Sequence, residues 1–453
     1  MKTRWLISLG FLGTILLGAF LLSLPVASPT HMWRPFGDAL FTACSTVCIT
    51  GLTVIDPGTE LSLFGQGVML ALVELGCVGI MTLATFFLVV IGRRLSLSSE
   101  FSLMSAYGTH GVKGLRSLIV WIVSAMLVIE ALGTVALWWA FTYDAPSLSA
   151  AFHDGMSWYR AFFYSVMSFA NAGFSLDPGS LSAFRSQPFV LLTMGIEVIL
   201  GGVGFFVIYN VCTIRFWERN LVRRGRLSLH SRVVLASTGI FLVFTYVFFF
   251  VAECNHALAG MPPLEKAVVT FFQAVTPRTC GFTVVPMEST REVTRFMSEV
   301  LMFIGAAPGG AGGGIKVTTF IVFLCTISAI YSGRHETVVW RRTVPLEIVR
   351  ESFVIFFFAV ALIAVAMAVL LVSESGTPGL TFENLLFETV SAVTTTGLTC
   401  GNTTVLLSPV GRVVLMVCML CGRLGAISVV LLIGGRDEPV SSIKYPKEEL
   451  VVG

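Results

Sequence analysis

Four glycines that recur in one local context are the residues of this sequence best suited to chemistry. They are Gly51, Gly173, Gly281 and Gly397. In one ungapped register, a phenylalanine lies ten residues before each glycine, an apolar residue follows it, and Ser or Thr comes second after it. Glycine allows a backbone that turns successive carbonyls to one side, and rings of carbonyls can replace the hydration shell of a cation. The pattern predicts four loops that meet at one axis.

The repeated positions extend on both sides of the glycines. The phenylalanines ten residues before the glycines are Phe41, Phe163, Phe271 and Phe387. The apolar residues directly after them are Leu52, Phe174, Phe282 and Leu398, and the hydroxyl residues that come second are Thr53, Ser175, Thr283 and Thr399. Twenty-eight residues after the four glycines, the same register gives Gly79, Gly201, Gly309 and Gly425. Because about one residue in ten is glycine, four at one chosen offset arise by chance roughly once in ten thousand trials, or about once in a few hundred when many offsets are scanned. The sequence is therefore interpreted as a fourfold internal repeat.

The composition places these repeats in a lipid bilayer. Of 453 residues, 55% are hydrophobic and only 12% are charged, with a mean hydropathy of +0.87. Soluble domains carry about 25% charged residues, so this chain has too few to coat a soluble globule. Its basic residues lie in short clusters between apolar runs, without a basic face suited to nucleic acid. We expect one membrane domain and no nucleic-acid partner.

Apolar runs long enough to cross a bilayer predict eight spanning helices. They fall near residues 5–24, 62–92, 115–141, 188–217, 231–252, 295–333, 350–372 and 408–434. The first run is too long for a secretory signal and is interpreted as a retained helix. Each successive pair of runs encloses a shorter apolar segment of about 10 to 14 residues, the length of a re-entrant piece. The expected fold is an all-α membrane protein of four tandem helix, pore-loop, helix units: residues 1–95, 96–220, 221–340, and 341–453 with a cytoplasmic tail.

Charge distribution predicts the orientation of these units. Cytoplasmic loops of membrane proteins carry an excess of Lys and Arg. The two termini and the segments between units contain 19 of the 29 basic residues, whereas the four re-entrant sides contain eight. Both termini should therefore be cytoplasmic, and every pore loop should enter from outside. The re-entrant half-helices would then aim their negative carboxyl ends at a cation.

Over nearly its whole length the sequence resembles the Trk/Ktr/HKT superfamily of potassium transporters, most closely the Ktr membrane subunit. The pieces that carry the resemblance are Thr46-Val47-Cys48-Ile49-Thr50-Gly51-Leu52, Asn171-Ala172-Gly173-Phe174, Thr279-Cys280-Gly281-Phe282 and Thr394-Thr395-Thr396-Gly397-Leu398, with a glycine-rich run in the third inner helix. In that family one glycine per loop marks the selectivity filter. Four glycines are associated with potassium preference, and serine at the first with sodium. The first loop departs slightly from the common pattern in Cys48 and Ile49.

The resemblance implies a K⁺ site made by carbonyls of the loops. Its expected residues are Cys48, Ile49, Thr50, Gly51, Asn171, Ala172, Gly173, Thr279, Cys280, Gly281, Thr395, Thr396 and Gly397. It also implies a homodimer with two separate pores and a cytosolic nucleotide-binding regulatory ring that docks on basic cytoplasmic loops. Na⁺ remains open as a coupling or activating ion. A sodium-permeable or sodium-coupled cation transporter of the same fold is the alternative.

The segment from Gly305 to Lys316 predicts a break in the third inner helix, since glycine and proline dominate it. A phosphate-binding loop is the rival, but Ile315 separates Gly314 from Lys316, so the Gly-Lys-Ser/Thr ending is missing. The resemblance implies a mobile intramembrane loop that obstructs the pathway beneath the filter. The gate residues expected there are Gly305, Gly309, Gly310, Gly312, Gly313, Gly314 and Lys316.

Arg423 is the second candidate gate residue. It lies in the fourth inner helix, where the other units have Cys77, Ile199 and Ala307. An arginine at membrane depth is costly and indicates function. Two hypotheses remain: a structural anchor that pairs with carbonyls of the broken helix, and a positive barrier to cations below the filter.

Other charged residues give weaker signals. Glu74 and Glu197 fall within spans, at repeat offsets that differ by one residue, and are interpreted mainly as structural supports. No paired acids or His/Cys constellation that would indicate an enzyme is apparent, and the six histidines are scattered. A secondary transporter with broken helices is closer, but two-helix units return the chain to the same side and so repeat in parallel, whereas such folds often use inverted repeats.

Overall fold

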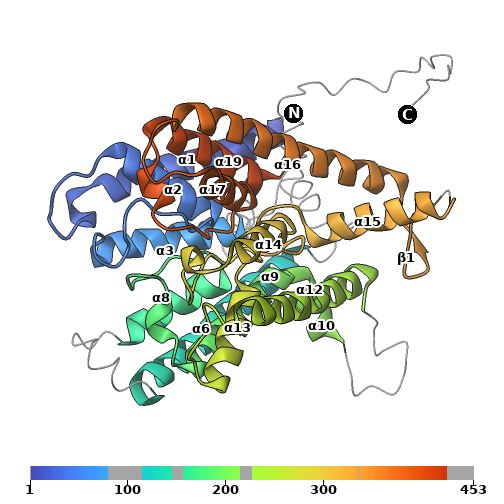
Figure 1. Ribbon diagram of the computed structural model, residues 1–453, viewed down its shortest axis with the longest axis horizontal. Coiled ribbons are helices and arrows are strands. Elements are labelled where there is room, and N and C mark those ends of the chain that lie inside the picture. Colours follow the sequence, from blue (N-terminus) through green and yellow to red (C-terminus); the bar gives the residue numbers. More distant parts are fainter. Residues whose placement is uncertain (1, 80–114, 145–156, 215–226, 335, 426–453) are drawn as a thin grey trace.

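The computed structural model describes residues 2–79, 115–144, 157–214, 227–334 and 336–425, and helices dominate it (Figure 1). Within these ranges the only strands are β1 (Val338–Val339) and β2 (Arg342–Thr343), a short antiparallel hairpin. Short helical turns occur at Pro25–Ala27, Ala140–Asp144, Ser182–Phe184 and Met287–Ser289. The predicted all-α fold is confirmed.

The helices form four consecutive units of one design. The outer helices are α1 (Lys2–Ser23), α6 (Leu115–Trp139), α12 (Leu229–Glu253) and α16 (Leu346–Ser373). Each is followed by a re-entrant helix of 13 residues, namely α2 (Phe36–Cys48), α8 (Ser157–Phe169), α13 (Pro263–Val275) and α17 (Phe382–Thr394). The inner helices begin with α3 (Leu63–Val78), α9 (Pro188–Val203), α14 (Glu292–Phe303) and α19 (Pro409–Leu424), the last preceded by the short α18 (Thr403–Leu406). Thirteen residues extend only about 20 Å, too short for a bilayer core of about 30 Å.

Local sequence explains where several of these helices begin. Ser62 and Ser408 cap α3 and α19, each accepting a hydrogen bond from the backbone N–H three residues later. Thr381 caps α17 in the same way through the backbone N–H of Asn384. Proline stands in the first turn of α9, α13 and α19, where its missing N–H costs no hydrogen bond.

The four units close into a ring. Each re-entrant helix packs against the inner helix of the preceding unit: α8 on α3, α13 on α9, α17 on α14, and α2 on α19. The last contact joins the two ends of the described chain, and Figure 1 shows α1 and α2, in blue, beside α17 and α19, in red. The arrangement brings Gly51, Gly173, Gly281 and Gly397 together at the centre.

Two inner helices are interrupted within the described residues, and the other two end at a glycine. Gly79 ends α3 and Gly425 ends α19, each with a positive φ. The α14 helix stops at Phe303 and α15 begins at Val317, which confirms the predicted break. The predicted span at 188–217 is not one straight helix, because α9 and α10 (Phe205–Thr213) meet at Gly204 with a bend of 95°. The φ of Gly204 is +94°, and this conformation ends the helix.

Three helices of the described chain are long and apolar enough to cross a membrane, and the bent pair α9–α10 would be a fourth. The three are Ile119–Tyr143, Leu229–Glu253 and Leu346–Ser373. Within the described residues, the predicted spans therefore correspond to these three outer helices, the shorter α1, the two broken inner segments α9–α10 and α14–α15, and the helices α3 and α19. The ends of the runs at 62–92 and 408–434 lie outside the described residues, as do the unit boundaries at 95 and 220.

Aromatic and apolar side chains anchor the re-entrant segments. Phe41, Phe163 and Phe387 are fully buried, as their repeated position predicts. In the third unit the fully buried residue is Phe272 and not Phe271, which is only partly buried. The α13 helix ends six residues before Gly281, whereas the other three re-entrant helices end three or four residues before their glycines. The longer connection changes which of the two phenylalanines faces the core. All four apolar residues that follow the glycines are buried.

Candidate functional site

Each loop holds its glycine in the left-handed backbone region. The φ angles are +92° at Gly51, +72° at Gly173, +83° at Gly281 and +85° at Gly397. Two residues earlier, φ is also positive in every unit: Ile49 (+56°), Asn171 (+56°), Thr279 (+71°) and Thr395 (+50°). Positive φ is uncommon for residues other than glycine and marks a strained backbone that its surroundings impose. Its recurrence on alternate residues gives the four loops one shared conformation. We refer to residues 49–51, 171–173, 279–281 and 395–397 as the glycine loops.

The glycine loops touch one another in cyclic order. A Cβ atom on Gly51 would lie 2.6 Å from the carbonyl oxygen of Ala172, and one on Gly173 would lie 2.4 Å from that of Cys280. A Cβ on Gly281 would meet the Thr396 oxygen at 2.7 Å, and one on Gly397 the Thr50 oxygen at 1.9 Å. Each glycine thus faces the carbonyl of the residue just before the glycine of the next unit. The four loops meet at one axis, as the repeat predicts, and glycine is required because a side chain would displace a carbonyl.

Around this axis the loop residues are buried. Cys48 is the last residue of α2, and Ile49, Thr50, Asn171, Ala172, Thr279, Cys280, Thr395 and Thr396 in the loops are all fully buried. The hydroxyls of Thr50, Thr279 and Thr395 have no hydrogen-bond partner among the described residues. Buried hydroxyls normally find a partner, so these three are available to a ligand.

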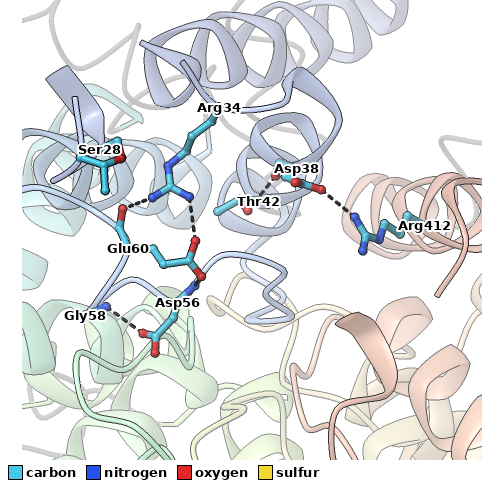
Figure 2. A network of polar contacts seen from close by, with 9 residues as sticks. Ser28, Arg34, Asp38, Thr42, Asp56, Gly58, Glu60 and Arg412 are labelled. Atoms are coloured by element: carbon cyan, nitrogen blue, oxygen red, sulfur yellow. Dashed lines mark hydrogen bonds and ion pairs between the residues drawn. The ribbon is translucent and has the colours of Figure 1, made fainter. Parts of the chain in front are cut away.

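An outer cavity of about 430 Å³ opens above the glycine loops. All four glycines line it, together with Asp56, Glu60 and Asp177. Figure 2 shows Asp56 beside Glu60, whose carboxylate also pairs with Arg34 at 2.9 Å. All three acids come from units 1 and 2, whereas units 3 and 4 line the cavity with neutral residues. The acids at the mouth of the central axis therefore all lie on one side, where Glu60 pairs with Arg34 and Asp177 with Arg160.

Beneath the glycine loops lies the connection between α14 and α15, residues 304–316. A Cβ on Gly312 would lie 1.8 Å from the Thr279 hydroxyl, and one on Gly313 would lie 2.2 Å from that of Thr395. The connection therefore lies directly against the inner end of two glycine loops. Its other side is tied to the second inner helix, because the Gly201 and Gly202 carbonyls accept hydrogen bonds from the backbone of Ala311 and Ala307, respectively, each at 3.1 Å.

Two cationic side chains hold successive carbonyls of this connection. The Arg423 guanidinium donates through Nη1 to the carbonyl of Ala311 and through Nη2 to that of Gly76, the latter at 2.6 Å. Lys316 donates through Nζ to the carbonyl of Gly312, also at 2.6 Å. Arg423 belongs to unit 4, the connection to unit 3 and Gly76 to unit 1. The pairing with broken-helix carbonyls expected of a structural anchor is therefore present.

The register of the inner-helix glycines differs from the prediction in unit 2. A Cβ on Gly76, Gly201 or Gly422 would lie within 2.3 Å of the carbonyl four residues before the glycine of its own loop. Gly201 is thus the counterpart of Gly76 and Gly422, and Gly204 is that of Gly79 and Gly425. The unit 2 residue at the position of Arg423 is accordingly Gly202 and not Ile199, because the inner segment of unit 2 is three residues longer.

The two spanning glutamates lie away from the axis, where units 1 and 2 meet. Glu197 accepts a hydrogen bond from Ser165 at 2.5 Å, and the same hydroxyl contacts the backbone carbonyl of Glu130 in α6 at 2.8 Å. These contacts join helices, in agreement with the predicted supporting role.

Sequence reasoning missed the acids of the outer cavity and one buried arginine. Asp56 and Asp177 follow their glycines by only a few residues, and that spacing was the available signal. Arg278, three residues before Gly281, is buried and borders a small cavity together with Gly202 and Ala306. A charged residue inside a re-entrant segment could have drawn attention to it.

The chain is similar to known proteins along almost its whole length. The family model TrkH, described as cation transport protein, matches residues 17–436. The chain is 34% identical over 451 residues to Ktr system potassium uptake protein B of Vibrio alginolyticus, covering 99% of this chain and 94% of that one. It is 31% identical over 450 residues to the protein of the same name from Bacillus subtilis, covering 99% and 96%.

Two further proteins extend the comparison. Potassium/sodium uptake protein NtpJ of Enterococcus hirae is 31% identical over 454 residues, covering 99% of this chain and 96% of that protein. The crystal structure of the potassium transporter TrkH from Vibrio parahaemolyticus superposes with a TM-score of 0.71 at 19% identity, covering 94% of this chain and 84% of that one, which shows a shared fold. With a family model that matches almost its whole length, the chain belongs to the TrkH family of cation transport proteins.

Proposed function

We propose that this membrane protein takes up potassium through a pore on the axis of the glycine loops, which form its selectivity filter. The observation that carries the proposal is the cyclic contact of each glycine with a carbonyl of the next unit. Rings of backbone carbonyls can replace the water shell of a dehydrating cation. The names of the relatives from Vibrio alginolyticus and Bacillus subtilis support potassium as the ion.

Charge around the axis favours cations throughout the outer half of the pathway. The outer cavity is lined by Asp56, Glu60 and Asp177, whereas Arg34 and Arg160, the partners of the last two, do not line it, so the acids favour cations over anions at its surface. The four re-entrant helices end at the glycine loops, so the negative ends of their dipoles face the ion.

The connection at residues 304–316 acts as a gate in this proposal. It lies against the glycine loops at Gly312 and Gly313, and Arg423 and Lys316 hold it there by hydrogen bonds to its carbonyls. Gly305, Gly309, Gly310 and Gly314 give it the freedom to move. In this position it obstructs the pathway, and two positive charges add an electrostatic barrier to cations.

We further place both termini in the cytoplasm, with unit boundaries near residues 95, 220 and 340, and propose that the chain works as a homodimer with a cytosolic nucleotide-binding ring. The excess of basic residues in the segments between units supports the orientation. Relatives named as proteins of a Ktr system support the existence of partner components.

Sodium permeation or sodium coupling is the second candidate. It is supported by the name of the Enterococcus hirae relative, a potassium/sodium uptake protein. Measuring the uptake of both K⁺ and Na⁺ separates the two candidates.

Replacing Gly51 by Ser tests the filter assignment. A Cβ there would lie 2.6 Å from the Ala172 carbonyl, and the φ of +92° disfavours any side chain. Uptake of labelled K⁺ and Na⁺ into proteoliposomes should show a K⁺ preference in the unaltered chain and its loss in Gly51→Ser. An unchanged ratio in a folded Gly51→Ser protein contradicts the filter assignment, and equal uptake of both ions by the unaltered chain favours the sodium candidate.

A further inference from the structure

Three ion pairs on the outer side of the molecule join successive units. Each pairs an acid in the first turn of a re-entrant helix with an arginine at the start of the preceding inner segment. Arg185 Nε lies 3.0 Å from Glu265 Oε1, Arg295 Nε lies 2.6 Å from Glu383 Oε1, and Arg412 Nη1 lies 2.6 Å from Asp38 Oδ1. Figure 2 shows the last of these, which joins units 4 and 1. We call them the inter-unit ion pairs.

Two of the arginines also hold their own connecting segments. Arg412 donates through Nη2 to the carbonyl of Val405 at 3.0 Å, and Arg295 donates through Nη1 to that of Thr290 at 2.9 Å. The planar guanidinium presents several donors in fixed directions, so one side chain can bind a carboxylate and a carbonyl together. The acids lie in the first turns of their helices, where the helix dipole favours a negative charge. Each arginine therefore ties a re-entrant helix to the preceding unit.

The junction between units 1 and 2 is built differently. Where the other three re-entrant helices carry an acid in the first turn, α8 carries Arg160, which pairs with Asp177 of its own unit at 2.7 Å. In unit 1, the position that corresponds to Arg412 is Gln66, whose amide donates to the carbonyls of Pro57 and Leu61. Within the described ranges, α3 and α8 also pack less extensively than the other three neighbouring pairs.

Each inter-unit ion pair acts on the end of a helix whose other end carries a glycine loop. A helix of 13 residues is a stiff rod about 20 Å long, so a tilt at its outer end displaces the loop at its inner end. The glycine loops meet at distances that leave no room for a Cβ atom. Small tilts of α2, α13 or α17 should therefore change the spacing of the carbonyls on the axis.

We propose that the inter-unit ion pairs position the glycine loops and thereby set the preference for K⁺ over Na⁺. The acids and arginines are positioning residues, since they act through the re-entrant helices and do not line the outer cavity. This inference rests on the proposed function of the glycine loops as a filter. A purely structural role is the alternative, because exposed ion pairs often contribute little.

The Asp38–Arg412 pair provides the test, through Asp38→Arg, Arg412→Glu and the double variant that exchanges the two charges. Uptake of labelled K⁺ and Na⁺ is measured with the full-length chain in cells that lack other potassium uptake systems and in proteoliposomes. The ratio of the two uptakes is the readout, because an altered surface potential acts equally on two monovalent cations. Each single variant should lower the K⁺/Na⁺ ratio by about fivefold, the change that roughly 1 kcal/mol of lost pairing produces, and the double variant should restore most of it.

Arg34→Gln is the matched control. It removes a pair of similar length, Arg34 with Glu60 at 2.9 Å, that lies within unit 1 and joins no two units (Figure 2). Its K⁺/Na⁺ ratio should stay unchanged, and a fall as large as that of Arg412→Glu would contradict the proposal.

The remaining outcomes are also decisive. An unaltered ratio in folded Asp38→Arg and Arg412→Glu proteins overturns the proposal. If these variants do not fold, Asp38→Asn and Arg412→Gln, which only neutralise the charges, are measured in the same way, and an unaltered ratio in both overturns it. When Gly51→Ser changes the ratio and the ion-pair variants do not, the positioning role fails alone; when Gly51→Ser leaves the ratio unchanged as well, the filter assignment itself fails.

Discussion

Replacement of Arg423 by Ala is the sharpest test of the proposed gate. The guanidinium lies in the last turn of α19 and joins three units, through hydrogen bonds to the carbonyls of Ala311 and Gly76. Alanine removes both bonds and the positive charge but leaves the helix, for which alanine has the highest propensity. We therefore expect the connection at residues 304–316 to leave its blocking position more often.

The size of the effect follows from the bond to Ala311. A hydrogen bond from a charged donor contributes about 1.5–3 kcal/mol, and its loss shifts the balance between blocking and open positions by about 10- to 150-fold. Lys316 still holds the Gly312 carbonyl in this variant. We therefore expect the lower end of that range, a rise in basal potassium flux of about tenfold.

Tracer uptake into proteoliposomes, with the purified chain and without cytosolic partners, measures the basal flux. Arg423→Lys is the matched control, because it retains the charge but cannot bind two carbonyls with one planar group. Its flux should rise less than that of Arg423→Ala. A monodisperse Arg423→Ala protein with unchanged or slower flux would refute the reasoning.

Two further predictions concern glycines that closely face other atoms. Gly397→Ala should abolish selective uptake, because its Cβ would lie 1.9 Å from the Thr50 carbonyl at a φ of +85°. The control is Gly67→Ala, on an exposed helical position with no atom within 4 Å of the new Cβ. It should leave tracer uptake unchanged and raise the free energy of unfolding by about 0.5–1 kcal/mol. Equal uptake by Gly397→Ala and Gly67→Ala would argue against the loop geometry. In Gly312→Ala the new Cβ would lie 1.8 Å from the Thr279 hydroxyl, which should push the connection at residues 304–316 away from the glycine loops. Basal flux should then rise in the same liposome assay. A fall in flux would indicate that the displaced connection blocks the pathway more tightly.

The meeting of the four glycine loops was predictable because their contacts are made by backbone. Only glycine adopts a φ near +85° without strain, so the constraint appears directly in the residue type at Gly51 and its three counterparts. The break in the third inner helix was predictable for the same reason, since glycine and proline disfavour a helix interior wherever they stand.

Other features lay beyond single-sequence reasoning because they depend on neighbours. The bend at Gly204 arises where the connection at residues 304–316 approaches it, with the Phe205 N–H donating to the Gly309 carbonyl at 3.1 Å. Gly201 lies three residues out of the predicted register, because the inner segment of unit 2 is longer than those of units 1 and 4. The Asp38–Arg412 pair spans almost the whole described chain and could be found only once the ring was seen to close.

The interlocked glycine loops have an evolutionary consequence. A channel assembled from four identical subunits receives every substitution four times, whereas one continuous polypeptide can alter a single quadrant of its aperture. This protein already does so, with Ile49, Asn171, Thr279 and Thr395 at one level of a backbone that is the same in all four quadrants. Because the glycine loop of every unit contacts that of the next, a substitution in one loop must be accommodated by its neighbour. Substitutions at these four positions should therefore occur together in neighbouring units during evolution.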